Sequence, residues 1–350
     1  MGKNKKKHGN KPAEKRVEQV LNDFSSLSEK YGSGGNKDAP GGQKPQDKAT
    51  AASQVVTPPP VRVAASHNRR TGKGLLVPSD TWAHFSDPKE MSVEMIDNLS
   101  LRYNKYLNYD GEDKALAKLN FEGKKFDDWK FNSEEIQRVS SKLADSAEKI
   151  SPLKPVIMRM TTDWRVAMGL GTSSVLENAL SFHHVYGFPY IPGQSFKGAI
   201  RSFVINMYFG KESEALQDLL FCTLFGSDDK GVTGERAGEL IFFDVYPCTP
   251  PKIEKDILNP HYTPYYRDGS HSKPPGDYYS PIPVEFLTVK ATTYNFIVAL
   301  PKDGDKEFSN EKWGSTTKRK LVTEWIEKAL SIFGIGAKTA VGYGRFSKKS

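Results

Sequence analysis

Cysteine is scarce in this sequence, which has only Cys222 and Cys248 among 350 residues. Two thiols cannot form the disulfide framework of a small secreted domain, and these two do not stand at a metal-ligand spacing. We therefore expect a chain from a reducing compartment, with no cofactor and no bound metal.

Long apolar runs are also absent. No stretch approaches the roughly 20 apolar residues that a membrane helix needs. The basic N-terminus "MGKNKKKHGNK" is not followed by the apolar segment of a signal peptide. The sequence predicts a soluble, cytoplasmic protein with no membrane partner.

An excess of positive charge is missing from most of the chain, although the net charge is +8. Residues 1–73 contain 15 Lys and Arg against 6 Asp and Glu, whereas residues 74–350 contain 35 against 36. Because the larger part is nearly neutral, a nucleic-acid site there must be a local arrangement of cations and aromatic rings.

The basic segment 1–73 is rich in Lys, Gly, Pro, Ser and Ala and poor in large apolar residues, so we predict a disordered tail. Within it, "AEKRVEQVLNDFSSL" has helical spacing. This stretch is either a docking helix or a transient helix. Residues 74–350 are predicted to form the globular domain.

The globular part begins with helical periodicity in residues 91–109 and 133–150, and residues 155–168 then read as a strand. Further strands are predicted at residues 179–191, 239–246, 284–300 and 340–347. Helices are predicted at residues 196–209, with Ser195 as N-cap, and at 318–333, which Gly334 ends.

From residue 179 onward these elements follow the order β-α-β-β-α-β, which is typical of the split ferredoxin-like fold and of the RRM scaffold. We therefore predict an α+β fold. It comprises a helical N-terminal part, a ferredoxin-like core at about 176–347 and a Pro- and Tyr-rich insertion at 247–283.

The glycine-rich stretch "FGIGAKTAVGYGRF" is the first candidate site. It precedes a strand, has Thr339 where a dinucleotide motif needs its last glycine, and has Ala337 where the Walker motif needs lysine directly after glycine. What remains is exposed backbone N–H groups with Lys338 and Arg345, which suits a sugar-phosphate chain. The alternative is a plain connection from helix to strand.

The segment "YIPGQSFKGAIR" is the second candidate site. Ser195 is expected to open a helix whose N–H groups favour an anion, and Lys197 and Arg201 lie four residues apart on one face. The alternative is a pair of solvated surface charges.

The insertion is the third candidate, because Tyr265, Tyr266 and Arg267 combine aromatic faces with a cation, as single-strand binding requires. The alternative is a loop that packs only on its own domain or on a partner protein.

The first two candidate segments resemble the central motif and the C-terminal glycine-rich loop of the RAMP superfamily of CRISPR-associated proteins. The stretches "NLSLRYNKY", "GLGTSSVLENALSFHHVYG", "NPHYTPYY" and "PIPVEFLTV" are similar to the sixth RAMP subunits of type III-B (Cmr) effector complexes. The resemblance covers roughly residues 97–346.

This resemblance implies a non-catalytic subunit of an RNA-guided, RNA-targeting complex in antiviral defence, located near the 3′ end of the guide. The implied partners are guide CRISPR RNA, target RNA and other RAMP subunits. The candidate RNA contacts are Ser195, Lys197, Arg201, Tyr265, Tyr266, Arg267, Gly334, Gly336, Lys338, Gly342, Gly344 and Arg345.

Two other function classes remain open. A metal-independent endoribonuclease of the same superfamily would use His183 or His184 to deprotonate a 2′-hydroxyl. On a strand the two histidines point to opposite faces, so at most one would face RNA. A scaffold that contacts only protein is the third class.

Overall fold

The computed structural model describes residues 74–75, 96–105, 108–109, 130–172, 178–260, 262, 265–266, 274, 276, 279–281 and 283–348. The predicted tail at 1–73 and the candidate Arg267 lie outside the described residues. In the described part, no helix has the length and apolar character that a membrane crossing requires.

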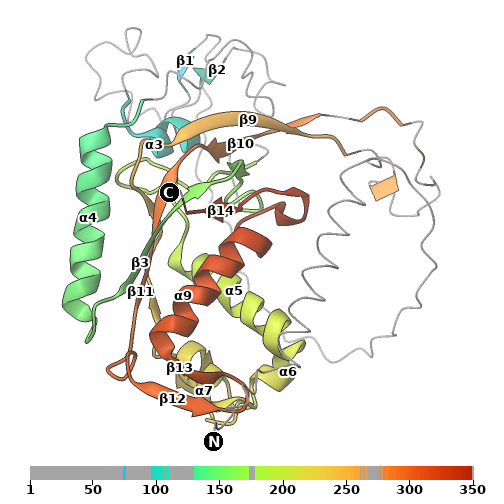
Figure 1. Cartoon of the computed structure of the whole chain (residues 1–350). Coiled ribbons are helices and arrows are strands. Elements are labelled where there is room, and N and C mark those ends of the chain that lie inside the picture. Colours follow the sequence, from blue (N-terminus) through green and yellow to red (C-terminus); the bar gives the residue numbers. More distant parts are fainter. Residues whose placement is uncertain are drawn as a thin grey trace, which may run out of the picture.

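The fold is a mixture of helices and antiparallel sheets (Figure 1). The strands are β1 (Gly74–Leu75), β2 (Asn108–Tyr109), β3 (Val156–Thr162), β4 (Arg165–Val166), β5 (Gly226–Ser227), β6 (Arg236–Ala237), β7 (Ile241–Phe242), β8 (Tyr246–Pro247), β9 (Lys252–Leu258), β10 (Val284–Lys290), β11 (Thr293–Ala299), β12 (Glu307–Asn310), β13 (Gly314–Thr317) and β14 (Phe346–Ser347). The helices are α3 (Leu99–Asn104), α4 (Ser133–Ile150), α5 (Gly193–Val204), α6 (Glu212–Ala215), α7 (Leu219–Phe225) and α9 (Lys318–Lys328).

The larger sheet has the strand order β14-β3-β11-β7, and β8 also pairs with β11. Its central pair is β3 with β11, in the register Tyr294↔Met160 and Phe296↔Met158. A second sheet has the order β4-β10-β9. Since β3 and β4 follow each other closely in the chain, the two sheets meet at residues 163–164.

Helices cover both faces of the larger sheet. In Figure 1, α4 lies on one side of β3 and β11, and α5 and α9 lie on the other. Asn132 caps α4 by accepting hydrogen bonds from Glu134 N and Glu135 N, and a buried Asn295 Nδ2 donates to Ser140 Oγ at 2.6 Å, which ties α4 to β11.

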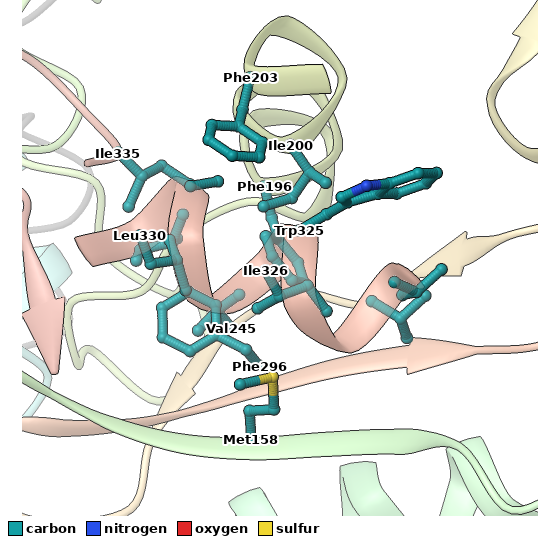
Figure 2. Close-up of a cluster of buried hydrophobic side chains, with 14 of the residues drawn as sticks. Met158, Phe196, Ile200, Phe203, Val245, Phe296, Trp325, Ile326, Leu330 and Ile335 are labelled. Atoms are coloured by element: carbon teal, nitrogen blue, oxygen red, sulfur yellow. The ribbon is translucent and has the colours of Figure 1, made fainter. Parts of the chain in front are cut away.

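The main core lies between the sheet and the pair α5 and α9. Phe196, Ile200 and Phe203 of α5 are fully buried and form the apolar face of this helix. Figure 2 shows these side chains facing α9 and the sheet; the other labelled residues are Met158, Val245, Phe296, Trp325, Ile326, Leu330 and Ile335.

Both core helices end in the same way. A π-helical turn follows each one, Ile205–Phe209 after α5 and Ala329–Phe333 after α9. Each turn is closed by a glycine with positive φ, 86° at Gly210 and 77° at Gly334. The predicted helix stop at Gly334 is confirmed, since a left-handed φ is easily adopted by glycine.

Four predicted strands are corrected by the structure. The strand predicted at 340–347 is present only as β14, since Thr339–Val341 forms a 3₁₀ turn. Residues 179–191 form a turn with isolated bridges, Phe182↔Pro189 and Ile191↔Val245, in place of a strand. The apolar run 284–300 is split into β10 and β11, which belong to different sheets, because the chain reverses around Ala291 with φ 46°. The predicted strand 239–246 is present only as the short β7 and the start of β8.

Candidate nucleic-acid interface

The glycine-rich loop after α9 is fastened to the end of β4 by backbone hydrogen bonds. Gly344 N donates to Arg165 O at 2.7 Å, Ala337 N donates to Ala167 O at 2.8 Å, and Ile335 N donates to Gly344 O at 2.9 Å. The loop is therefore folded back on itself and held against β4.

Three of its four glycines are required by this packing. A Cβ on Gly334 or Gly336 would lie 2.9 Å or 2.5 Å from a backbone carbonyl oxygen, and a Cβ on Gly344 would be closer still, to Ile335 O. Gly342 differs, because a Cβ there would meet nothing within 4 Å. The close approach that the first three glycines permit is to the chain's own backbone, and only Gly342 faces open space.

Lys338 stands at the turn of the loop with φ 60°, in the left-handed region. Its Nζ lies 5.6 Å from the centroid of the Phe286 ring and 5.8 Å from that of Tyr343. The half-buried ammonium has no ion-pair partner among the residues that the structure describes.

Arg345 follows the last glycine and is half-buried. Its carbonyl oxygen accepts a hydrogen bond from Asp163 N at 2.9 Å, and its Nε is buried with no hydrogen-bond partner in the described part of the chain. Since a buried guanidinium nitrogen usually has a partner, this arginine is the best-placed cation of the loop for an added anion.

A charged network missed by the sequence reasoning lies beneath the loop. Arg165 pairs with Glu254 at 2.6 Å and with Asp256, and Tyr343 Oη donates to Asp256. Burial alone would raise the pKa of Asp256, but hydrogen bonds from Tyr343, Ile257 N and Arg165 hold that pKa below its usual value. The cation of Arg165 is therefore already neutralised, unlike those of Lys338 and Arg345.

The start of α5 differs from the prediction. Ser195 is an exposed residue inside the helix, and the N-cap is Pro192. Gly193 N donates to Asp244 Oδ1 at 2.7 Å. A carboxylate of this chain therefore already occupies the helix N-terminus, where the sequence predicted a bound phosphate, because Asp244 is brought there from the loop between β7 and β8.

Lys197 and Arg201 do lie together, in a pocket of ≈ 410 Å³ that Arg236 also lines. Arg201 pairs with Glu212 at 2.7 Å. Burial, and then the charge of Arg201, lower the pKa of Lys197. No hydrogen bond, ion pair or ring contact joins these two cations to Lys338 or Arg345 of the glycine-rich loop, although all four residues are described.

In the insertion, the rings of Tyr265 and Tyr266 lie 5.3 Å apart in an edge-on arrangement, and Tyr266 has 73% of its surface exposed. The first part of the insertion is the regular strand β9. A role of these rings in RNA binding stays a prediction.

The two histidines have different environments. His183 Nδ1 accepts hydrogen bonds from Val185 N at 3.2 Å and Tyr186 N at 3.3 Å, and its Nε2 lies 3.1 Å from Tyr246 Oη. His184 is exposed. With both nitrogens of His183 engaged, its neutral form has no free lone pair to act as a base.

The pKa of His183 is lowered from its ordinary value of 6.5, chiefly by burial, with His184 adding to the effect and Asp244 opposing it. Below pH about 6.5, His183 is therefore protonated more readily in the unfolded chain than in the folded chain, so lowering the pH favours unfolding. We expect thermal stability to fall between pH 7.5 and 5.5, and the fall to be smaller in His183→Gln. The exposed control His184→Gln should change the profile much less than His183→Gln does; equal profiles for all three proteins would contradict a buried neutral His183.

In the described residues, no three His, Cys, Asp or Glu side chains gather as metal ligands do.

The sequence comparisons identify proteins that this chain resembles. The family model described as "RAMP superfamily" matches residues 157–347. The CRISPR system Cmr subunit Cmr6 of Pyrococcus furiosus is 30% identical over 250 residues, which cover 57% of this chain and 70% of that protein. The Cmr6 subunit of Saccharolobus solfataricus is 24% identical over 223 residues, covering 61% of this chain and 65% of that protein.

Two solved structures also match. A chain from the cryo-EM structure of the type III-B Cmr-beta bound to cognate target RNA has 23% identity and a TM-score of 0.47, covering 63% of this chain and 67% of that one. The crystal structure of Cmr6 from Pyrococcus furiosus has 26% identity and a TM-score of 0.32, covering 57% of this chain and 100% of that one.

Proposed function

Because the chain belongs to the RAMP superfamily and, within it, to the Cmr6 family of type III-B CRISPR systems, we propose that it is a non-catalytic, guide-RNA-binding subunit of a CRISPR ribonucleoprotein. This ribonucleoprotein targets RNA in antiviral defence in the cytoplasm, and the subunit binds near the guide 3′ end. Its partners are the guide CRISPR RNA, target RNA and other RAMP subunits of the Cmr complex. The similarity to Cmr6 of Pyrococcus furiosus carries this proposal.

We also propose a ferredoxin-like core that starts at β3, upstream of residue 176. The strand order β14-β3-β11-β7 with antiparallel pairing supports it. In this arrangement α5 connects β3 to β7, and α9 connects β11 to β14. Both crossover helices then lie on the same face of the sheet, as in the β-α-β-β-α-β motif.

The RNA contact is assigned first to the glycine-rich loop. Lys338 and Arg345 support this assignment, because both cations lie beside an open Gly342 without an ion-pair partner in the described part of the chain. Backbone phosphates would supply the missing anions, which is the main source of affinity for nucleic acids. The glycines at 334, 336 and 344 shape the loop and need not touch RNA.

The pocket at α5 is the second assigned contact. Lys197 has no ion-pair partner among the described residues, whereas Arg201 is paired with Glu212. Lys197 is therefore the stronger phosphate ligand of the two. Ser195 is exposed two residues earlier on the same helix.

The non-catalytic role is supported by the hydrogen bonds of His183, which leave no acceptor atom for a 2′-hydroxyl proton. An endoribonuclease that uses the exposed His184 is the other function within the same superfamily. It would need a second group to protonate the leaving oxygen, and the neighbouring His183 is already held by its hydrogen bonds to Val185 N, Tyr186 N and Tyr246 Oη.

Affinity purification of the chain from its native host, with sequencing of the bound small RNA, tests the proposal. We expect CRISPR-derived RNA and other Cmr subunits in the eluate, and labelled RNA incubated with the purified chain should stay whole. An eluate that contains the subunits without RNA would indicate a protein scaffold. Cleavage that is lost in the double variant His183→Ala, His184→Ala would instead favour the ribonuclease.

A further inference from the structure

An exposed tryptophan adjoins the glycine-rich loop. Trp164 lies in the turn between β3 and β4, and 49% of its surface is exposed. Its ring centroid is 4.7 Å from that of Tyr343 at an interplanar angle of 50°. The guanidinium of the next residue, Arg165, is 5.2 Å from the same ring. An aromatic residue and a cation thus support the tryptophan from within the protein.

This support is rigid. Tyr343 is only 5% exposed, and its hydroxyl donates to Asp256. Asp163 N donates to Arg345 O at 2.9 Å, directly before the tryptophan in the chain. Because the backbone on both sides is pinned and the ring beneath is buried, the exposed half of Trp164 is presented to solvent in a fixed position.

The surface beside this ring belongs to the same loop. Val341 is 62% exposed, and Gly342 leaves open space. The Nζ of Lys338 also lies close to the Tyr343 ring, at 5.8 Å from its centroid. Tyr343 thus lies next to both the half-exposed ring of Trp164 and the unpaired cation of Lys338. Arg345 is linked to this region through its carbonyl oxygen, which accepts from Asp163 N.

We propose that Trp164 is a base-stacking residue, which holds one nucleobase of a single-stranded RNA whose phosphates bind Lys338 and Arg345. The inference rests on the proposed RNA-binding function and adds a subsite to it. Every base has a π-face, so such a contact tolerates any sequence. RNA is favoured over a protein partner because Lys338 and Arg345 of the adjoining loop have no carboxylate partners in the described structure, and the exposed ring offers a flat face to a planar ligand.

Binding of a labelled 12-nucleotide oligouridylate to the full-length protein tests this inference. Trp164→Ala should weaken binding by about 5- to 150-fold, the range for loss of one stacked base. Trp164→Phe should retain most of the affinity, whereas Trp164→Leu should lose it, since leucine is apolar without a π-face. The dependence of affinity on salt should stay as in wild type, because stacking neutralises no phosphate.

Leu219→Ala is the matched control, because Leu219 is an exposed apolar side chain on α7, 66% exposed, and should leave RNA binding unchanged. The melting temperature of each variant identifies any that fails to fold. If Trp164→Ala fails to fold, comparing Trp164→Phe with Trp164→Leu still tests the stacking role.

The outcomes separate this inference from the proposed function. Wild-type protein that binds no oligouridylate overturns both. Normal binding by Trp164→Ala or Trp164→Leu overturns the stacking role alone. If Trp164→Ala binds RNA normally but no longer co-purifies with other Cmr subunits, Trp164 contacts protein and the stacking role is overturned as well.

Discussion

Gly344→Ala is expected to lower the free energy of unfolding by about 3 kcal/mol or more, a large fraction of the roughly 5–15 kcal/mol that holds a typical domain. Two costs add. A left-handed backbone, here with φ 73°, costs a side-chain-bearing residue roughly 1–2 kcal/mol. The new Cβ would also overlap Ile335 O, and forced overpacking costs roughly 1–3 kcal/mol. Urea unfolding followed by tryptophan fluorescence measures the loss.

Gly342→Ala separates these two costs. Gly342 has φ 96°, so it has the same backbone strain, but its Cβ would meet nothing within 4 Å. We expect this variant to lose only about 1–2 kcal/mol. Equal stability of the two variants would contradict the close contact between Gly344 and Ile335 O.

Helices α4, α5 and α9 were predictable from the sequence because each has one continuous apolar face. Helices α6 and α7 were not predicted, and the helix predicted at 91–109 is present in the described residues only as α3. The period of Ile136, Val139 and Ala147 in α4, and of Phe196, Ile200 and Phe203 in α5, coincides with the residues found buried. A helix is defined by neighbours three and four residues away, so its pattern is complete within a short window of sequence. The predicted strand within residues 155–168 is likewise present, as β3 and β4.

The incorrect strands share a physical reason. Residues 179–191 contain apolar side chains that are buried, such as Phe188 and Ile191, but the backbone hydrogen bonds close locally, from His183 N to Phe188 O at 2.7 Å and from Gly187 N to His183 O at 2.8 Å. A run of apolar residues indicates burial and does not indicate the pairing partner. The break at Ala291 is invisible for the same reason, since both flanking strands are buried.

The candidate site was predictable in part. A glycine-rich stretch with two cations predicts a loop with positive φ, and four glycines there have it. The sequence does not show what the glycines pack against. At three positions, Gly334, Gly336 and Gly344, they pack against the chain's own backbone. The pairing of Arg165 with Asp256 joins residues 91 positions apart, and Asp244 reaches Gly193 N from 51 positions away. Both depend on strand pairing, which no local pattern specifies.

Lys338→Ala and Arg345→Ala are expected to weaken RNA binding through salt-dependent contacts. For single strands, each phosphate contact contributes about 0.7 to the slope of log affinity against log salt. Each variant should flatten this slope by about 0.7, and the double variant by about 1.4. Relative to 1 M salt, the double variant should lose roughly 25-fold in affinity at 0.1 M. Titrations of labelled oligouridylate at several salt concentrations measure both quantities.

Lys328→Ala is the matched control for the single variant Lys338→Ala. It also removes one positive charge, but Lys328 Nζ is already paired with Glu324 at 2.5 Å on the surface of α9. If the net charge of the protein governs binding, the control will flatten the slope as much as Lys338→Ala does. If the loop makes discrete phosphate contacts, the control will keep the wild-type slope. The effect should also be the same for every RNA sequence, since backbone contacts position a strand without specifying bases.

Arg345 needs a separate measurement, because its buried Nε places part of the guanidinium inside the fold. A buried donor without a partner costs stability, so Arg345→Ala should leave the melting temperature unchanged or slightly higher if the arginine serves RNA. Should this variant keep its salt slope and melt at a lower temperature, Arg345 braces the loop against β3. The phosphate contact would then be left to Lys338 alone, with a slope change of about 0.7 for the double variant as well.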